Sequence, residues 1–127
     1  MTVPQEQHHD ADFDEAAFTR TARLLKEEIG VTIEMYLEDA ARYTANIKAA
    51  LNEGDTAKAA LNSHPLKSNS LGLGLVRVSA AAKAINEAAL DGDITTCRAA
   101  LPELEDALKI AAQTLHGALK KAEEKPT

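Results

Sequence analysis

The sequence predicts an all-α protein, an up-and-down antiparallel four-helix bundle with an additional N-terminal helix. Alanine and leucine, two of the strongest helix formers, account for 25 and 15 of the 127 residues. Aromatic side chains, which favour strands, make up only 3% and tryptophan is absent. Apolar residues recur in alternating steps of three and four, the spacing of one helix face. Because alanine is small, we expect the helices to pack closely.

The domain organisation follows from length and polarity. A chain of 127 residues fits a single domain with one core. Residues 1–12 are polar and show no apolar periodicity, so we interpret them as a flexible N-terminal tail. Residues 13–122 form the predicted helical-bundle domain, and residues 123–127 are interpreted as a C-terminal tail.

Two helices are predicted in the first half of the chain. The first begins near Asp12 and Asp14, which suit an N-cap and first turn, and ends at Gly30. Its apolar stripe consists of Phe18, Ala22, Leu25 and Ile29. The second helix ends at Gly54 and Asp55. Its apolar face consists of Ile33, Leu37, Ala40, Thr44, Ile47 and Leu51.

A third helix is predicted to begin after Asp55, a good N-cap, and to run from Thr56 toward Gly72 and Gly74, which mark its end or a bend. A fourth helix follows. Its stripe consists of Leu75, Val78, Ala82, Ile85 and Ala89.

The last helix is predicted in two parts. After a turn at residues 91–93, Thr95 or Thr96 caps a short lead-in, and Pro102 occupies the first turn of the main helix. The main helix carries Leu104, Leu108, Ala111, Leu115 and either Ala118 or Leu119. Four of the five predicted helices are long enough to form a bundle.

Composition and motifs exclude several classes of function. The net charge of -6 argues against a protein that binds nucleic acid through phosphate contacts. No apolar run long enough to span a membrane and no signal-peptide pattern occur, and the single Cys97 cannot close an internal disulfide, which fits a cytoplasmic protein. The phosphate loop, the dinucleotide-binding fingerprint, C-x-x-C and H-E-x-x-H are all absent.

Three histidines are interpreted without a chemical role. His8 and His9, near Asp10 and Asp12, could hold a metal ion weakly, but a solvated tail is the simpler interpretation. His116 in the last helix is interpreted as an ordinary surface or partly buried histidine.

His64 differs because of its neighbours in the predicted third helix. Lys67 and Ser68, three and four residues further on, share its helix face. Another face is apolar or small, at Leu66, Ser70 and Leu73. An imidazole is nucleophilic near pH 7, and an ammonium group one turn away can stabilise an anion transferred onto it. This arrangement is the chemistry of a phosphohistidine.

This stretch resembles the histidine-containing phosphotransfer (HPt) domains of multistep phosphorelays. Their motif is close to H-x-L-K-G-[SA]-[SA]-x-x-L-G, and this sequence has in register His64, Leu66, Lys67, Ser70, Leu73 and Gly74. Residues 85–93 and 101–105 resemble the end of the family's fourth helix and the start of its last helix. The resemblance covers residues 14–122, and it implies an HPt-like bundle.

The resemblance also implies roles for individual residues. His64 would be phosphorylated at Nε2, and Lys67 would be the positively charged neighbour of the phosphoryl group. Asn86 stands where relatives often have a polar residue that hydrogen-bonds the histidine or holds a water beside it. The residues expected to support the site or contact the partner are Ser68, Asn69, Ser70 and Asn86.

The implied partner is the receiver domain of a response regulator or a hybrid histidine kinase, which supplies both the phospho-aspartate and Mg²⁺. The chain itself would need no ATP, cofactor or metal, and would be a phosphotransfer intermediate with no kinase domain. We expect a cytoplasmic monomer that binds neither nucleic acid nor membrane.

Charge placement favours such a partner independently of the motif. Residues 57–90 contain four basic and one acidic residue, a charge of +3, whereas the rest of the chain has ten basic and nineteen acidic residues, a charge of -9. A locally positive face suits a receiver pocket built from carboxylates. The alternative is that these cations, Lys58, Lys67, Arg77 and Lys83, form an ordinary solvated surface.

Pro65 is the strongest departure from the family pattern. It directly follows His64 and removes the amide that would bond to the Leu61 carbonyl. We expect either a kink at Leu61 or a new helical start at Pro65 with Ser63 or His64 as its cap. Either would shift the imidazole.

Smaller departures concern the partner surface. Ser68 replaces a usual glycine, and its hydroxyl would either crowd the partner or donate a hydrogen bond to the phosphoryl oxygens. Asn69 replaces a usual Ser or Ala, and Leu90 replaces a frequent arginine, for which Arg77 or Lys83 are the candidate substitutes.

Two functions of different classes follow from the sequence. The first is a carrier that accepts a phosphoryl group on His64 from one receiver and delivers it reversibly to another. The alternative is an HPt-like module that binds receivers or partner helices without carrying phosphate, which Pro65 favours. A bundle that binds a metal or small ligand is a third, weaker interpretation.

Overall fold

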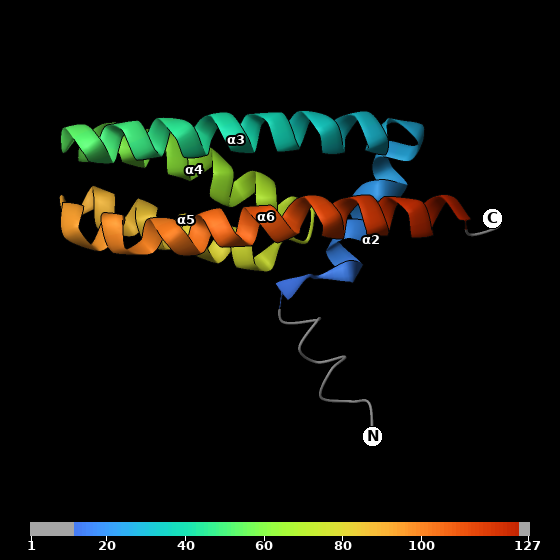
Figure 1. Cartoon of the computed structure of the whole chain (residues 1–127). Helices are drawn as coiled ribbons and strands as arrows, with labels where there is room; N and C mark the ends of the chain where they lie inside the picture. The colour runs from blue at the N-terminus through green and yellow to red at the C-terminus, as the bar shows by residue number, and fades with distance from the viewer. Residues whose placement is uncertain (1–11, 125–127) are drawn as a thin grey trace, which may run out of the picture.

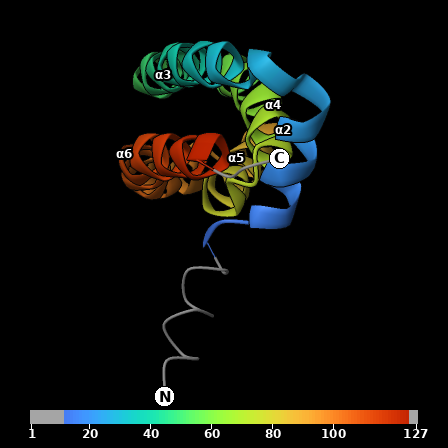
Figure 2. The same cartoon turned by 90° about the vertical axis from the view of Figure 1, so that its right-hand side faces the viewer.

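The protein is an antiparallel helical bundle. The computed structural model describes residues 12–124, and its helices are α2 (Glu15–Leu25), the 3-10 turn η1 (Lys26–Glu28), α3 (Ile29–Glu53), α4 (Thr56–Gly72), α5 (Val76–Leu90) and α6 (Ile94–Glu124). Helices α3 to α6 alternate in direction, and α3 packs against α6 to close the bundle (Figures 1 and 2). Helix α2 crosses one end, near the C-terminus of α6 (Figure 1). The predicted all-α four-helix bundle with an additional N-terminal helix is confirmed.

The boundary between α2 and α3 lies earlier than predicted. Asp14 caps α2, since its Oδ1 accepts the Ala17 N–H at 3.1 Å. The helix ends at Leu25, before the C-cap Lys26 with its φ of 55°, and not at Gly30, which lies inside α3. The prediction was wrong because Ile29 belongs to the buried face of α3, with Ile33 four residues on, and not to the stripe of α2.

The turns of the bundle are the ones the sequence predicts. Gly54 ends α3 in the left-handed conformation at a φ of 74°, which glycine adopts without strain. Asp55 then caps α4, because its Oδ1 accepts the Lys58 N–H at 3.0 Å. Asp91 and Gly92 form the turn between α5 and α6.

Helix α6 is one continuous helix, so the predicted lead-in capped by Thr95 or Thr96 is wrong. Asp93 precedes the helix and accepts the backbone N–H and the hydroxyl of Thr96 at 3.1 and 2.6 Å. These two hydrogen bonds, the hydroxyl's first, lower the pKa of Asp93. The helix also includes Glu123 and Glu124, which the sequence analysis assigned to the tail.

Pro102 lies inside α6 and does not begin a helix as predicted. Its ring removes the donor to the Arg98 carbonyl, but Arg98 and Pro102 are both exposed, so water can satisfy that group. On the other side, Cys97 and Leu104 are completely buried. One continuous buried stripe therefore holds the helix together across the proline.

The core contains large aliphatic side chains and many alanines. Three alanines are completely buried, as expected for close packing, namely Ala50, Ala59 and Ala82. Larger side chains fill the space between them, namely Ile33, Ile47, Leu51, Leu66, Ile85, Leu104 and Leu115. Within residues 12–124, none of the helices combines the length and apolar character needed to cross a membrane.

Helix α2 is attached to the turn between α4 and α5. The Asp14 N–H donates to the Gly74 carbonyl at 2.7 Å, and the Thr21 hydroxyl donates to the Gly72 carbonyl at 2.6 Å. Gly74 has a φ of 81°, and a Cβ there would lie 2.3 Å from the Asp14 carbonyl oxygen. Glycine is therefore required at position 74, and α2 covers the C-terminal end of α4.

Candidate functional site

Helix α4 continues through Pro65, which lies inside it. A new helical start at Pro65, with Ser63 or His64 as a cap, was one of the two predicted alternatives, and it is wrong because α4 runs unbroken from Thr56 to Gly72. The Leu61 carbonyl loses its usual donor at the missing proline amide. Leu61 is 73% exposed, so this carbonyl belongs to the solvent-facing side of the helix.

The solvent-facing side of α4 carries His64. Ser68, one turn further along, is also exposed, and Lys67 beside them is half-buried. Leu61 and Leu71 extend this face in both directions and are 73% and 56% exposed. We refer to Leu61, His64, Lys67, Ser68 and Leu71 as the His64 face. The predicted grouping of His64 with Lys67 and Ser68 is compatible with this arrangement.

Ser70 does not belong to the His64 face. Its side chain is completely buried, as are Ser63 and, to within 1%, Leu66. Ser70 Oγ donates to the Leu66 carbonyl at 2.6 Å, and Ser63 Oγ donates to the Ala59 carbonyl at 2.9 Å. Ser70 therefore lies in the core, on the apolar face predicted for it with Leu66. Of the two roles expected for it, support of the site and contact with the partner, this position allows only support, whereas the neighbouring Asn69 is exposed.

Asn86 reaches from α5 to the turn of α4 that precedes His64. Its Nδ2 donates to the Ala60 carbonyl at 3.0 Å and to Ser63 Oγ at 3.2 Å. Both hydrogens of the amide group are thus used, and the side chain is buried. Its amide hydrogens are engaged by the turn that precedes His64, and a hydrogen bond from this side chain to the His64 ring, or a water held beside the ring, stays a prediction.

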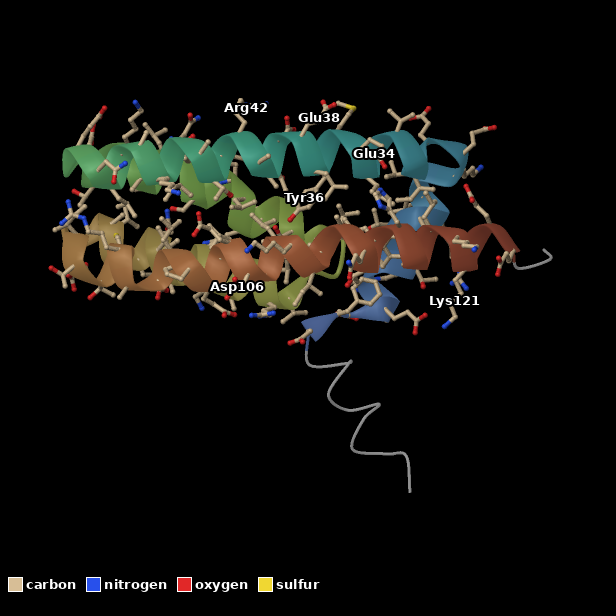
Figure 3. The ribbon with its side chains drawn as sticks, in the orientation of Figure 1. Glu34, Tyr36, Glu38, Arg42, Asp106 and Lys121 are labelled. Carbon is tan, nitrogen blue, oxygen red and sulfur yellow. The ribbon has the colours of Figure 1, made fainter. Side chains whose placement is uncertain are left out.

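Tyr36 is a second polar anchor of α4 that the sequence pattern did not predict. Because the Ser70 hydroxyl hydrogen is used on the Leu66 carbonyl, the Tyr36 hydroxyl donates to Ser70 Oγ, at 2.6 Å. Figure 3 shows Tyr36 pointing from α3 into the bundle, whereas Glu38 and Arg42 point away from it. Burial raises the pKa of Tyr36 to about 12, against the lowering effect of Ser70.

The signal for this anchor was present in the sequence. Ser63 and Ser70 lie seven residues apart, on the apolar face of the predicted helix. Buried hydroxyl groups need partners, and Tyr36 brings one from the buried stripe of α3. Which helix supplies each partner depends on the packing, which the sequence alone does not specify.

Arg77 and Lys83, two of the basic residues in the positively charged stretch 57–90, have different surroundings. Arg77 donates to both carboxylate oxygens of Glu103 in α6, at 2.7 and 2.9 Å, and this contact lowers the pKa of Glu103. Arg77 is thus engaged with α6 and does not replace the cation that the family often has at position 90. Lys83 is exposed on α5.

The antiparallel pairing of α4 and α5 places Lys83 level with His64. Ser79 Oγ donates to the Lys67 carbonyl at 2.9 Å, while Asn86 contacts Ser63. Lys83 lies between Ser79 and Asn86 in α5, as His64 lies between Ser63 and Lys67 in α4. Of the two candidate substitutes for the cation at position 90, Lys83 is therefore the one that is exposed and level with His64 along the bundle.

In the described part of the chain, the remaining histidine and the carboxylates form no second site. Within residues 12–124, no three histidine, cysteine, aspartate or glutamate side chains come together as a metal site. The cluster of His8 and His9 lies outside the described residues. His116 is exposed, as one predicted alternative had it, and its Nε2 lies 2.7 Å from Oε2 of Glu34 across α6 and α3.

Comparison with known proteins agrees with the helical bundle. Residues 31–119 match the Hpt domain family. The fold is similar to histidine-containing phosphotransfer protein B from Pseudomonas aeruginosa, with a TM-score of 0.82 and 19% identity over 87% of this chain and 96% of that chain. It is also similar to a rice protein described as a histidine-containing phosphotransfer protein, with a TM-score of 0.76 and 18% identity over 90% and 85% of the two chains. No curated protein sequence matches.

Proposed function

The chain belongs to the Hpt domain family, and from that premise we propose that it carries a phosphoryl group on His64 between receiver domains. Histidine phosphotransfer in a phosphorelay is the role of this family, and the residue and partners are what the proposal adds. The observation that carries it is the exposed imidazole of His64 on α4, beside Lys67 and level with Lys83.

The proposed step is a reversible displacement at phosphorus. The lone pair of His64 Nε2 forms the P–N bond as the P–O bond to the receiver's aspartate breaks, and the electron pair leaves with the carboxylate. The proton on Nδ1 stays in place. The ammonium groups of Lys67 and Lys83 stabilise the negative charge on the phosphoryl oxygens. Delivery to a second receiver is the same step in reverse.

Ser68 and Asn69 are proposed to contact the phosphoryl group or the partner. Both are exposed, and Ser68 lies one helical turn after His64. The Ser68 hydroxyl can donate to a phosphoryl oxygen, which a glycine at this position could not do. This favours the hydrogen-bonding role of Ser68 over simple crowding of the partner.

The proposed partner surface combines charge with apolar contacts. A receiver pocket contains carboxylates, which the lysines near His64 complement. Leu61 and Leu71, exposed on either side of His64, provide apolar area for a transient interface. Mg²⁺ and the phospho-aspartate belong to the receiver in this proposal. The carrier acts as a cytoplasmic monomer without a cofactor or a kinase activity of its own.

The proposal is tested by phosphoryl transfer from a panel of radiolabelled phospho-receivers. The wild type is expected to acquire an acid-labile, base-stable label, and His64→Gln is expected to acquire none. His116→Gln is the matched control, because it removes the other described histidine outside the His64 face. Equal labelling of wild type and His64→Gln would contradict the proposal.

Pro65 favours a second candidate, a module that binds receivers without carrying phosphate. A proline beside the histidine perturbs the helical hydrogen bonds on which the imidazole depends. In that case the protein would bind a receiver, as measured by calorimetry, while no receiver of the panel labels it. Label on the wild type would exclude this candidate.

A further inference from the structure

In the turn of α4 that precedes His64, one backbone carbonyl lacks its usual helical N–H donor. Pro65 supplies no N–H to the Leu61 carbonyl, and its ring crowds the preceding turn of the helix. In the same turn, the neighbouring Ala60 carbonyl accepts an additional hydrogen bond from α5, through Asn86 Nδ2 at 3.0 Å. A side chain from another helix therefore braces the segment that the proline weakens.

This brace is specific to the residues just before His64. The second hydrogen of the Asn86 amide goes to Ser63 Oγ at 3.2 Å, and that hydroxyl donates to the Ala59 carbonyl at 2.9 Å. Asn86 is only 6% exposed and Ser63 is fully buried, so both hydrogen bonds are shielded from water. The backbone from Ala59 to Ser63, the turn that precedes His64, is thus connected to α5.

We propose that Asn86 is a positioning residue for His64, which acts through the Ala60 carbonyl and Ser63 and is needed because Pro65 interrupts the helix hydrogen bonds. The inference rests on the proposed function and gives Asn86 a role without contact to the phosphoryl group. Small displacements of a reacting group are costly, since about 1 Å can reduce a rate about 100-fold.

A matched control lies on the far side of Pro65. Tyr36 anchors the same buried face of α4 through Ser70, at 2.6 Å, but this anchor follows the proline in the sequence. The helical amides donating around Ser70 are not affected by Pro65. Tyr36→Phe removes that anchor while it retains the aromatic ring, so it loosens α4 without changing the turn before His64.

The test is a double-mutant cycle between Asn86→Ala and Pro65→Ala. Transfer from one phosphorylated receiver is measured over a range of receiver concentrations, which separates the maximal transfer rate from receiver binding. We expect Asn86→Ala to lower the maximal rate about tenfold, with receiver affinity within about twofold. In the Pro65→Ala background the same substitution should lower the rate less than about twofold, because the helix has regained its own donor.

The control defines the outcome that contradicts the inference. Tyr36→Phe should change the maximal rate by the same factor in the wild-type and Pro65→Ala backgrounds. Equal effects of Asn86→Ala in both backgrounds would overturn the inference. If Asn86→Ala does not give a helical protein by circular dichroism, Asn86→Leu is used instead. It keeps the number and branching of the side-chain heavy atoms, removes both donors and is subject to the same criterion.

A second measurement separates this inference from the proposed function. Amide hydrogen exchange at His64 should be faster in Asn86→Ala than in wild type, and this difference should shrink when Pro65 is also replaced by alanine. Absence of transfer in the wild type would remove the proposed function, and the exchange cycle would still decide whether Asn86 and Pro65 are coupled. Equal acceleration in both backgrounds would contradict the coupling.

Discussion

The two faces of helix α4 use their polar groups in opposite ways. On the buried face, Ser63 and Ser70 have hydrogen-bond partners both within α4 and from neighbouring helices. On the His64 face, the imidazole and the Ser68 hydroxyl are exposed between Leu61 and Leu71. One helix thus separates the groups that fix its position from those available for chemistry.

Two leucines on opposite faces should show the largest difference in stability. Leu66 is 1% exposed, and Leu66→Ala should lower the free energy of unfolding by about 2–5 kcal/mol. Leu61 is 73% exposed, and Leu61→Ala should change it by less than about 0.5 kcal/mol. Urea unfolding measures both. If Leu61→Ala were as destabilising as Leu66→Ala, the assignment of the two faces would be wrong.

Pro65→Ala should act in the opposite direction and raise the stability. Alanine restores the amide for the Leu61 carbonyl, and an interior proline costs a helix up to about 3 kcal/mol. The matched control for replacing a proline inside a helix is Pro102→Ala, because Pro102 lies in the interior of α6. Thermal unfolding should show a higher midpoint for Pro65→Ala than for wild type. A lower midpoint would show that α4 depends on the proline.

Tyr36→Phe should have a smaller effect, about 1 kcal/mol of destabilisation, because one buried hydrogen bond to Ser70 is lost while the ring remains. Tyr43→Phe is the control, since Tyr43 is only half-buried in the same helix. Urea unfolding at neutral pH compares the two variants. Equal stability of Tyr36→Phe and wild type would contradict the role of Tyr36 as an anchor of α4.

The same tyrosine predicts a dependence of stability on alkaline pH. Burial raises the pKa of Tyr36 to about 12 from its ordinary value of 10.0. A group with a raised folded-state pKa contributes stability that is complete below the unfolded-state pKa and is lost as the pH rises through the folded-state value. The wild type should therefore lose more stability than Tyr36→Phe between about pH 10 and 12. Parallel pH profiles of the two proteins would contradict this.

Ser68→Gly should have only a small effect on stability. Ser68 is exposed, and the change costs at most about 1 kcal/mol of helix propensity. Its effect on function distinguishes the two roles considered for the hydroxyl. If the hydroxyl stabilises the phosphoryl group, the transfer rate should fall severalfold with receiver affinity unchanged. A gain in receiver affinity would show that Ser68 crowds the partner.

Most helix boundaries could be predicted because they depend on local chemistry. Asp55 and Gly54 specify a cap and a left-handed turn within a few residues of one another. The break at Lys26 could not be predicted in this way, since a positive φ at a lysine reflects tertiary packing and not local preference. Pro102 was misplaced because the buried stripe of α6 outweighs the local signal for a helix start.

The His64 face was predictable from spacing along a single helix. Lys67 and Ser68 follow His64 at helical intervals, so their proximity needs no tertiary information. The residues that hydrogen-bond α4 inside the bundle were not predictable in the same way. The contacts of Asn86 with Ala60 and of Tyr36 with Ser70 depend on how three helices are rotated about their axes, which the pattern of apolar residues defines only coarsely.

The decisive measurement locates the phosphoryl group on the folded protein. After transfer from a phosphorylated receiver, nuclear magnetic resonance of ¹⁵N-labelled protein should show coupling between phosphorus and Nε2 of His64. The signals of the buried face, including the Asn86 side chain, should be nearly unchanged. Coupling at another histidine would contradict the assignment of His64 as the phosphoryl carrier. The same conclusion would follow if the receiver transferred its phosphoryl group to this protein and no nitrogen showed coupling to phosphorus.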